Sequence, residues 1–240
     1  MAEENRATKD MCEFCFDTII HQLQRSKESL PPYPCNDRFP LFVTWKKKPG
    51  LRSSFIAESV SEEYHLRGCI GTFSPLALSD GLKQYAIIAA FKDHRFDPIV
   101  MSEVPQLKCA VSLLVNFEEV DVGNVYDWEV GTHGIRIKFE VNGREYGGTY
   151  LPEVAKEQEW TKEETVSSLV RKAGFKGKVT HSLLESIELE RYQSSKVDMT
   201  YEEYVECKNN TNGKVGTARQ FSTSKSLGSM DESDESDDEY

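Results

Sequence analysis

The sequence has no long apolar run, no apolar leader and no dense set of cysteines. No segment approaches the roughly 20 apolar residues that a membrane-spanning helix needs, and residues 1–9 are polar, unlike a secretory signal. The six cysteines are scattered along 240 residues, unlike those of small disulfide-bonded domains. These absences exclude a membrane-spanning or disulfide-scaffold protein, and they predict free thiols in the reducing interior of a cell.

Long basic segments are also missing, although the chain is strongly charged. The formal net charge is −11, and residues 229–240 contribute seven acids without a base. The longest basic run, Lys46-Lys47-Lys48, is followed by Pro49-Gly50 and is expected at a solvated hairpin tip. Without a basic surface to neutralise phosphates, direct binding of nucleic acid is disfavoured.

Metal and phosphate motifs are absent as well. The five histidines show no pairing at ligand spacing, and no glycine-rich loop precedes a predicted helix. Cys12-x-x-Cys15 has a spacing found in zinc and redox sites. Both cysteines lie on the apolar face of a predicted helix over 9–25, so packed core thiols are the favoured interpretation. No metal site is predicted, and the sequence indicates no particular cofactor.

The chain contains short strands and helices in the mixture typical of an α+β fold. Residues 107–117 show a strict period of two, Asn142-Gly143 favours a tight hairpin turn, and Thr161 and Glu164 have capping-box spacing. No internal repeat and no regular strand–helix crossover is visible, which favours antiparallel sheets flanked by helices. Strands are predicted over 41–45, 64–73, 107–117, 135–141, 144–151 and 187–193, and helices over 9–25, from Pro75, over 152–159 and 161–173, and from Tyr201.

Three regions follow from this pattern. Residues 1–9 form a flexible N-terminus, residues 10–208 form the folded domain, and residues 209–240 form an acidic, serine-rich tail that is predicted to be disordered. Ser229, Ser233 and Ser236 lie among acids, where acid-directed kinases act, and phosphorylation would add further negative charge. A tail that only increases solubility fits the same composition.

The stretch Leu66-Arg67-Gly68-Cys69-Ile70-Gly71-Thr72 combines a cation, a thiol, a hydroxyl and two glycines. Glycines inside a predicted strand indicate a bulge or a close approach to the backbone. In a regular strand Arg67 and Cys69 share one face. We therefore predict that this stretch lines a ligand pocket. The predicted ligand-binding residues are Arg67, Gly68, Ile70, Gly71 and Thr72.

Two interpretations of Cys69 stay open. A thiol reacts as the thiolate, which a nearby cation favours, so Cys69 is a candidate nucleophile and Arg67 a candidate anion-binding group. Acyl transfer would also need a base, for which His133 is the best candidate. The alternative is a small buried Cys69 in a tight sheet, with Arg67 paired to an acid such as Glu153 or Glu157 and His133 hydrogen-bonded to backbone.

Extended by Phe73, the stretch resembles the signature of the AMMECR family, named for the Alport syndrome, mental retardation, midface hypoplasia and elliptocytosis chromosomal region. The resemblance covers about residues 10–207. A longer loop between Lys48 and Tyr64 and the acidic tail depart from the family pattern. Further segments that resemble the animal members are 13–17, 40–45, 92–96, 128–135 and 151–158.

The resemblance implies one α+β domain with a larger and a smaller lobe, in a nuclear or cytoplasmic protein. It implies no established activity, and some microbial relatives are linked to a Memo-type domain and a radical-SAM enzyme, which is only an association. The first hypothesis is a regulatory domain that binds a protein partner or small ligand through the predicted pocket. An enzyme that uses Cys69 is the second hypothesis, and a nucleic-acid-associated nuclear factor is the third. The oligomeric state is left open.

Overall fold

The computed structural model describes residues 6–49 and 63–219, with side chains described as far as residue 210. The chain divides into two compact units, residues 1–201 and residues 202–240. The second unit contains most of helix α6 (Tyr201–Arg219). The first unit contains the other helices and strands.

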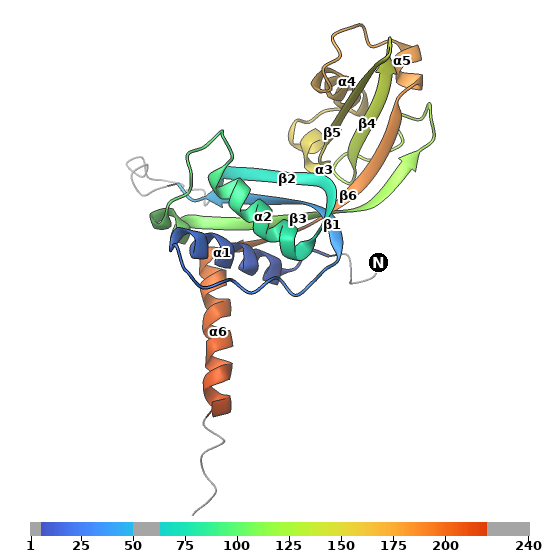
Figure 1. Cartoon of the computed structure of the whole chain (residues 1–240). Helices are drawn as coiled ribbons and strands as arrows, with labels where there is room; N and C mark the ends of the chain where they lie inside the picture. The colour runs from blue at the N-terminus through green and yellow to red at the C-terminus, as the bar shows by residue number, and fades with distance from the viewer. Residues whose placement is uncertain (1–5, 50–62, 220–240) are drawn as a thin grey trace, which may run out of the picture. The chain divides into compact units, whose positions relative to one another are not determined.

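The first unit is built on one six-stranded sheet with the order β2-β1-β3-β6-β4-β5 (Figure 1). Every neighbouring pair of strands is antiparallel. The predicted α+β class is confirmed, with a single continuous sheet in place of separate sheets. The strands are β1 (Arg38–Lys47), β2 (His65–Ala77), β3 (Leu107–Val120), β4 (Gly134–Val141), β5 (Arg144–Tyr150) and β6 (Glu188–Thr200).

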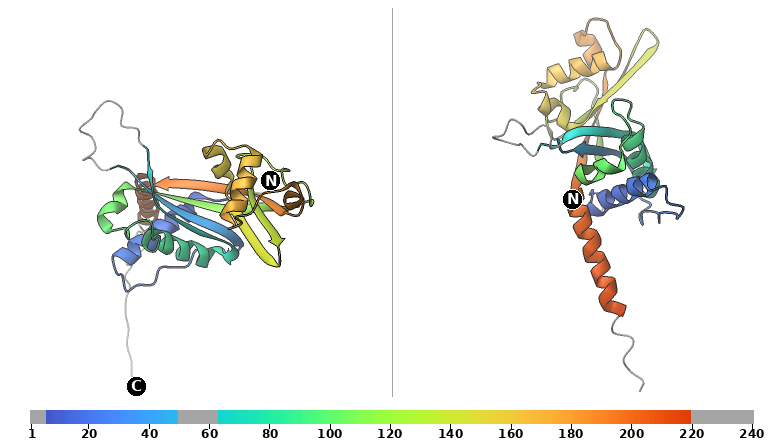
Figure 2. Two further views of the ribbon diagram at one scale, coloured as in Figure 1. Left: turned by 90° about the horizontal axis from the view of Figure 1, so that it is seen from above. Right: turned by 90° about the vertical axis from the view of Figure 1, so that its left-hand side faces the viewer.

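Two helices, α1 (Lys9–Leu23) and α2 (Leu78–Phe91), lie side by side against the β1–β3 end of the sheet (Figures 1 and 2). Trp45 of β1 is fully buried between them. Its ring meets Phe16 of α1 edge to face, and its Nε1 donates to the Ala86 carbonyl of α2 at 3.1 Å. Cys12 and Cys15 are fully buried on α1, which confirms the interpretation as core thiols.

The β4–β5 end has its own apolar core, covered by α3 (Pro152–Glu157), α4 (Lys162–Lys172) and α5 (His181–Glu185). This core forms the smaller lobe, and β3 and β6 run through both lobes (Figure 1). The predicted turn at Asn142-Gly143 is confirmed by positive φ angles at both residues, and the capping box of Thr161 and Glu164 is also present. Core residues include Trp128, Ile135, Ile137, Leu169 and Val170.

Strand β3 departs from the predicted alternation of buried and exposed residues. Cys109, Val111 and Leu113 are buried as expected, but Ala110 and Leu114 are buried too. Both faces of this strand are therefore covered over residues 109–115.

Three boundaries differ from the predicted ones. Pro75 does not start a helix: it lies in β2, and α2 begins at Leu78. β2 is an edge strand, where the missing N–H of a proline removes no ladder hydrogen bond. The basic run is not a hairpin tip, because β1 continues to Lys47. Helix α6 extends past Lys208 to Arg219.

Parts of three predictions fall outside the described residues. These are residues 1–5 of the N-terminus, residues 50–62 of the long loop and residues 220–240 of the acidic tail. None of the helices in the described part of the chain combines the length and apolarity that crossing a membrane requires.

Candidate functional site

Cys69 lies on the face of the sheet that points away from α1 and α2. In β1 the alternate residues Val43 and Trp45 are buried on the helix side, so Thr44 points to the opposite face. Thr44 pairs directly with Cys69 of β2, and its Oγ1 donates to the Cys69 Sγ at 3.1 Å. We call this surface the Cys69 face; it carries Thr44, Cys69 and Phe73.

The backbone of Cys69 is held on its outer edge by a turn that follows α2. The Asp93 carboxylate accepts from the Cys69 N–H at 2.9 Å, and the Arg95 guanidinium donates to the Cys69 carbonyl at 3.1 Å. Arg95 also donates to Asp93 at 2.6 Å. The turn thus occupies the edge of β2 as a neighbouring strand would, which protects that edge from pairing with another chain.

The charge of Asp93 is fixed by the same contacts. The hydrogen bond from Arg95 is the main cause that holds the pKa of Asp93 well below its usual range, and it outweighs burial, which acts in the opposite direction. The N–H groups of Cys69 and Arg95 add to this effect. Sequence reasoning missed this arrangement, although both charged residues lie in the 92–96 segment that resembles the family.

Arg67 is neutralised by a partner within the protein. A shift in the β1–β2 register places it at a bulge, next to Gly68, so it does not follow the regular alternation assumed for the strand. Its guanidinium donates to both carboxylate oxygens of Glu103, at 3.1 and 3.0 Å, and to the Asp97 carbonyl. Lys47 also contacts Glu103, at 2.7 Å.

Burial alone would raise the pKa of Glu103, but the hydrogen bonds from Arg67 and Lys47 and from the Val100 N–H together lower it to about 2. Glu103 therefore stays ionised and holds Arg67 in place. The expectation that Arg67 pairs with an acid holds in this form, with Glu103 in the place of Glu153 or Glu157.

The space beside Gly68 and Gly71 is occupied by other segments of the same chain. A Cβ atom on Gly68 would lie 2.0 Å from the Ala89 carbonyl oxygen of α2. One on Gly71 would lie 2.3 Å from the Leu41 carbonyl oxygen of β1. No real Cβ atom tolerates such distances, so both glycines are needed for packing between segments of this domain.

The other predicted ligand-binding residues also have internal neighbours. Ile70 pairs with Val43 of β1, and the Thr72 Oγ1 accepts from the Ser74 N–H at 3.0 Å. Their roles in ligand binding, like those of Arg67 and the two glycines, stay predictions.

His133 accepts a hydrogen bond at Nδ1 from the Glu129 N–H at 3.0 Å, within the turn before β4. With this lone pair occupied, the neutral ring carries its proton on Nε2. The contacts of the described residues do not join His133 to Cys69. The predicted partnership of these two residues in catalysis has no direct contact to support it.

A row of aromatic rings leads from the Cys69 face to a groove. Phe73 contacts Phe42 at a centroid distance of 5.4 Å and Tyr192 at 5.8 Å, and Tyr192 stacks on Phe117 at 5.1 Å. Burial raises the pKa of Tyr192, whose hydroxyl donates to the Tyr150 carbonyl. Phe73 is also part of the groove wall, so the groove begins where the predicted signature ends.

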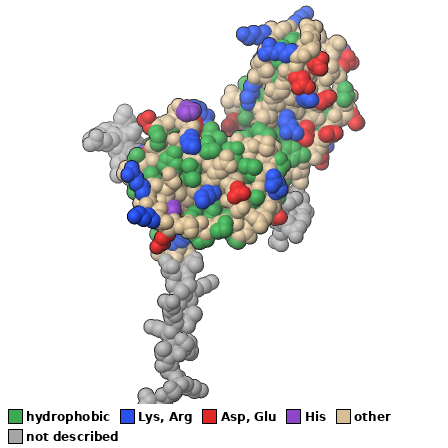
Figure 3. Space-filling view, in the orientation of Figure 1, with side chains coloured by type: hydrophobic (Ala, Val, Ile, Leu, Met, Phe, Trp, Pro, Cys, Tyr) green, Lys and Arg blue, Asp and Glu red, His purple; other side chains and the backbone are tan. Residues whose placement is uncertain are grey.

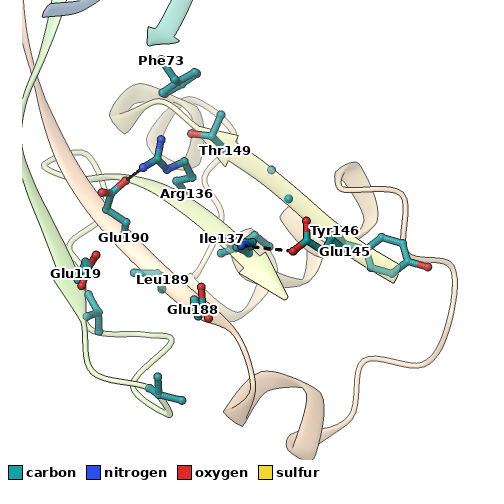
Figure 4. Close-up of a pocket in the computed structure, with 15 residues that line it drawn as sticks. Phe73, Glu119, Arg136, Ile137, Glu145, Tyr146, Thr149, Glu188, Leu189 and Glu190 are labelled. Carbon is teal, nitrogen blue, oxygen red and sulfur yellow. Dashed lines mark ion pairs between the residues drawn. The ribbon is translucent and has the colours of Figure 1, made fainter. Parts of the chain in front are cut away.

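The groove has a volume of about 850 Å³ and lies over strands of the smaller lobe (Figure 4). Sequence reasoning did not find it, because its residues come from distant strands. Two ion pairs line it, between Arg136 and Glu190 at 2.5 Å and between Lys138 and Glu145 at 3.5 Å. Other lining residues are Phe73, Glu119, Val120, Tyr146, Gly147, Thr149 and Glu188.

No cluster of three or more His, Cys, Asp or Glu side chains suited to a metal ion occurs within residues 6–49 and 63–219. Cys12, Cys15 and Cys109 approach one another in the core, where burial raises the pKa of the Cys109 thiol. All six cysteines are free thiols.

Comparison with known proteins gives matches over most of the chain. The model of the family described as AMMECR1 matches residues 12–197. An uncharacterized protein of Arabidopsis thaliana is 42% identical over 213 residues, which cover 88% of this chain and 93% of that protein. An uncharacterized protein of Schizosaccharomyces pombe is 41% identical and covers 82% of this chain and 95% of its own length.

The fold also has a counterpart among solved structures. The crystal structure of an uncharacterized protein from Pyrococcus horikoshii aligns with a TM-score of 0.58 and 22% sequence identity. The alignment covers 79% of this chain and 91% of the archaeal chain. At this identity the similarity concerns the fold.

Proposed function

The chain belongs to the AMMECR1 family, and we propose that it is a binding domain whose ligand or protein partner occupies the groove beside Phe73. The observation that carries this proposal is the groove itself. Its volume of about 850 Å³ lies within the range of small-molecule sites, roughly 300–1,000 Å³. Its walls combine aromatic, aliphatic and charged side chains, as binding sites do.

The signature contributes to this groove by positioning Phe73. Gly68 and Gly71 fix β2 against α2 and β1, and the Asp93 turn fixes its edge. Phe73 is thereby set at the start of the groove, in contact with Tyr192. In this proposal the motif builds a rigid wall, and the ligand contacts its last residue.

We extend the proposal to the subgroup of the family and to the cellular compartment of the protein. We place the chain among the animal-type members, which its long matching segments support, and in the nucleus or cytoplasm, which the free thiols support. We also propose that the chain acts as a regulatory domain through this binding.

Ligand binding can be tested by NMR on the full chain labelled with ¹⁵N. Small-molecule probes carrying amine, carboxylate, phosphate or thiol groups are titrated in turn. We expect at least one class to shift the amides of Phe73, Gly147 and Thr149 saturably. A Gly147→Val variant, which fills the groove, should lose those shifts. Absence of saturable shifts at these amides with every class would refute the proposal.

A second candidate function is chemistry at Cys69. It is favoured by the Thr44 hydroxyl on the sulfur and by Arg95. The hydrogen bond to Asp93 raises the pKa of Arg95, and the Arg95 guanidinium donates to the Cys69 carbonyl oxygen at 3.1 Å. A cation near the cysteine and a hydrogen-bond donor on its sulfur atom are typical surroundings of a reactive thiol. In this proposal Cys69 is the nucleophile, and Arg95 takes the place predicted for Arg67.

Thiol reactivity separates this candidate from pure binding. Iodoacetamide should alkylate Cys69 several-fold faster than Cys35, which is also partly buried but donates to the Asp37 carboxylate. A Thr44→Val variant keeps the shape of the side chain and should slow Cys69 while leaving Cys35 unchanged. Rates are read by mass spectrometry at pH 7. Equal rates for the two thiols, unaffected by the substitution, would eliminate the candidate. Cys109 is a poor comparator because it is fully buried.

A further inference from the structure

We infer that the groove binds a basic, extended segment of a protein partner, with lysine or arginine side chains at alternate positions. This inference rests on the proposed binding function and specifies the partner. Its support comes from the charge of the groove, the spacing of its carboxylates and the exposed backbone at Gly147.

The lining of the groove has an excess of negative charge. It contains four glutamates against two cations, and both cations are already engaged by Glu190 and Glu145. Within the described part of the chain, Glu119 and Glu188 have no ion-pair partner, and both are exposed. Acidic side chains are also frequent on the visible surface of this lobe (Figure 3). A cationic ligand would complete the pairing.

The two unpaired carboxylates are spaced as an extended peptide requires. Glu119 of β3 lies directly opposite Glu190 of β6, and Glu188 is two residues along from Glu190, as Figure 4 shows. Such diagonal neighbours have Cα atoms roughly 7–8 Å apart. An extended chain places residues i and i+2 on one side about 7 Å apart, so two alternate lysines match Glu119 and Glu188.

The neighbouring groove surface favours a peptide. Gly147 is exposed, and among the described residues the only atom within 4 Å of a Cβ built there is the Ile137 carbonyl oxygen, at 3.5 Å. The backbone is therefore open on the groove side. Val122, which is 69% exposed, adds an apolar contact at the groove. A peptide backbone with occasional apolar side chains can use all of these groups.

The test uses the full chain and a fluorescein-labelled decapeptide that alternates lysine with serine. The matching peptide with glutamate in place of lysine is the negative control. Fluorescence anisotropy at low salt should show binding of the lysine peptide only. The double variant Glu119→Lys/Glu188→Lys should weaken binding about tenfold, and Gly147→Val should weaken it at least as much.

The matched control is Glu140→Lys, an exposed acid on the same face of β4 and outside the groove. It makes the same change of charge per site and should alter the dissociation constant less than twofold. Failure of the lysine peptide to bind, or equal weakening by Glu140→Lys, would overturn the inference. So would self-association of the chain, measured by sedimentation, that the double variant abolishes, because the occupant would then be a second copy.

Failure of this inference can be told apart from failure of the proposed function. If the lysine peptide does not bind but another probe class shifts the groove amides and Gly147→Val removes the shifts, only the choice of partner is wrong. If no probe reaches the groove, the binding function fails as well.

Discussion

Replacing Gly68 by alanine should destabilise residues 1–201 by about 3 kcal/mol or more, the upper end of what overpacking costs. The new Cβ atom would lie 2.0 Å from the Ala89 carbonyl oxygen. This oxygen belongs to the backbone of α2, so a side-chain rotation cannot relieve the clash. The strand and the helix must separate, which exposes part of the core around Trp45. Urea unfolding followed by circular dichroism measures the loss.

Gly147→Ala is the matched control, because Gly147 is also a strand glycine. Within the part of the chain that the structure describes, its Cβ atom would meet only the Ile137 carbonyl oxygen at 3.5 Å, an ordinary contact, so the change in stability should stay within about 1 kcal/mol. Cys69→Ser, on the same strand as Gly68, should also have a small effect. Equal unfolding midpoints for Gly68→Ala and Gly147→Ala would contradict the packing account.

This contrast changes the meaning of the signature. A glycine can serve a ligand or serve packing, and local sequence does not distinguish the two uses. At Gly68 and Gly71 the space belongs to α2 and β1. At Gly147 it is open and faces the groove. Gly147, the glycine that leaves room for a ligand, therefore lies outside the predicted signature at residues 66–72.

Local rules predicted the elements well where one short segment decides the outcome. The hairpin at Asn142-Gly143 and the capping box at Thr161 need only a few neighbouring residues, and both are present. Pro75 was misassigned because proline fits the first turn of a helix and an edge strand equally well. The choice depends on whether a further strand pairs with β2, which only the whole sheet determines.

The site was less predictable because its contacts join distant segments. Arg67 is hydrogen-bonded to Glu103, which is 36 residues further along the chain. The Cys69 N–H donates to Asp93, which is 24 residues further along. Periodicity says which face a side chain occupies, but it does not say which of 40 acids will meet a given cation. The bulge at Arg67 also breaks the alternation on which the predicted pairing of Arg67 with Cys69 relied.

The turn that holds Cys69 gives the second large effect. Asp93→Ala should cost about 3 kcal/mol, because hydrogen bonds to a charged group contribute roughly 1.5–3 kcal/mol and their loss leaves the partly buried Cys69 N–H without its acceptor. The Asp93 side chain is only 4% exposed and accepts from the Cys69 N–H and from Arg95. Asp97→Ala, an exposed acid in the same loop, should stay within about 0.5 kcal/mol. Urea midpoints at pH 7 compare the two variants.

The pH dependence gives the sign of the Asp93 effect independently. The pKa of Asp93 is lowered in the folded state, so its contribution is complete above the pKa of about 3.9 of an unfolded aspartate. That contribution is lost as the pH falls from about 5 towards the folded value. The advantage of wild type over Asp93→Asn should therefore begin to shrink below pH 5, be clearly smaller at pH 3 and continue to fall at lower pH, while it stays constant from pH 6 to pH 8. A gap that persists unchanged at pH 3 would show that Asp93 acts through its shape. The proposal that the charge of Asp93 stabilises the edge of β2 would then be wrong.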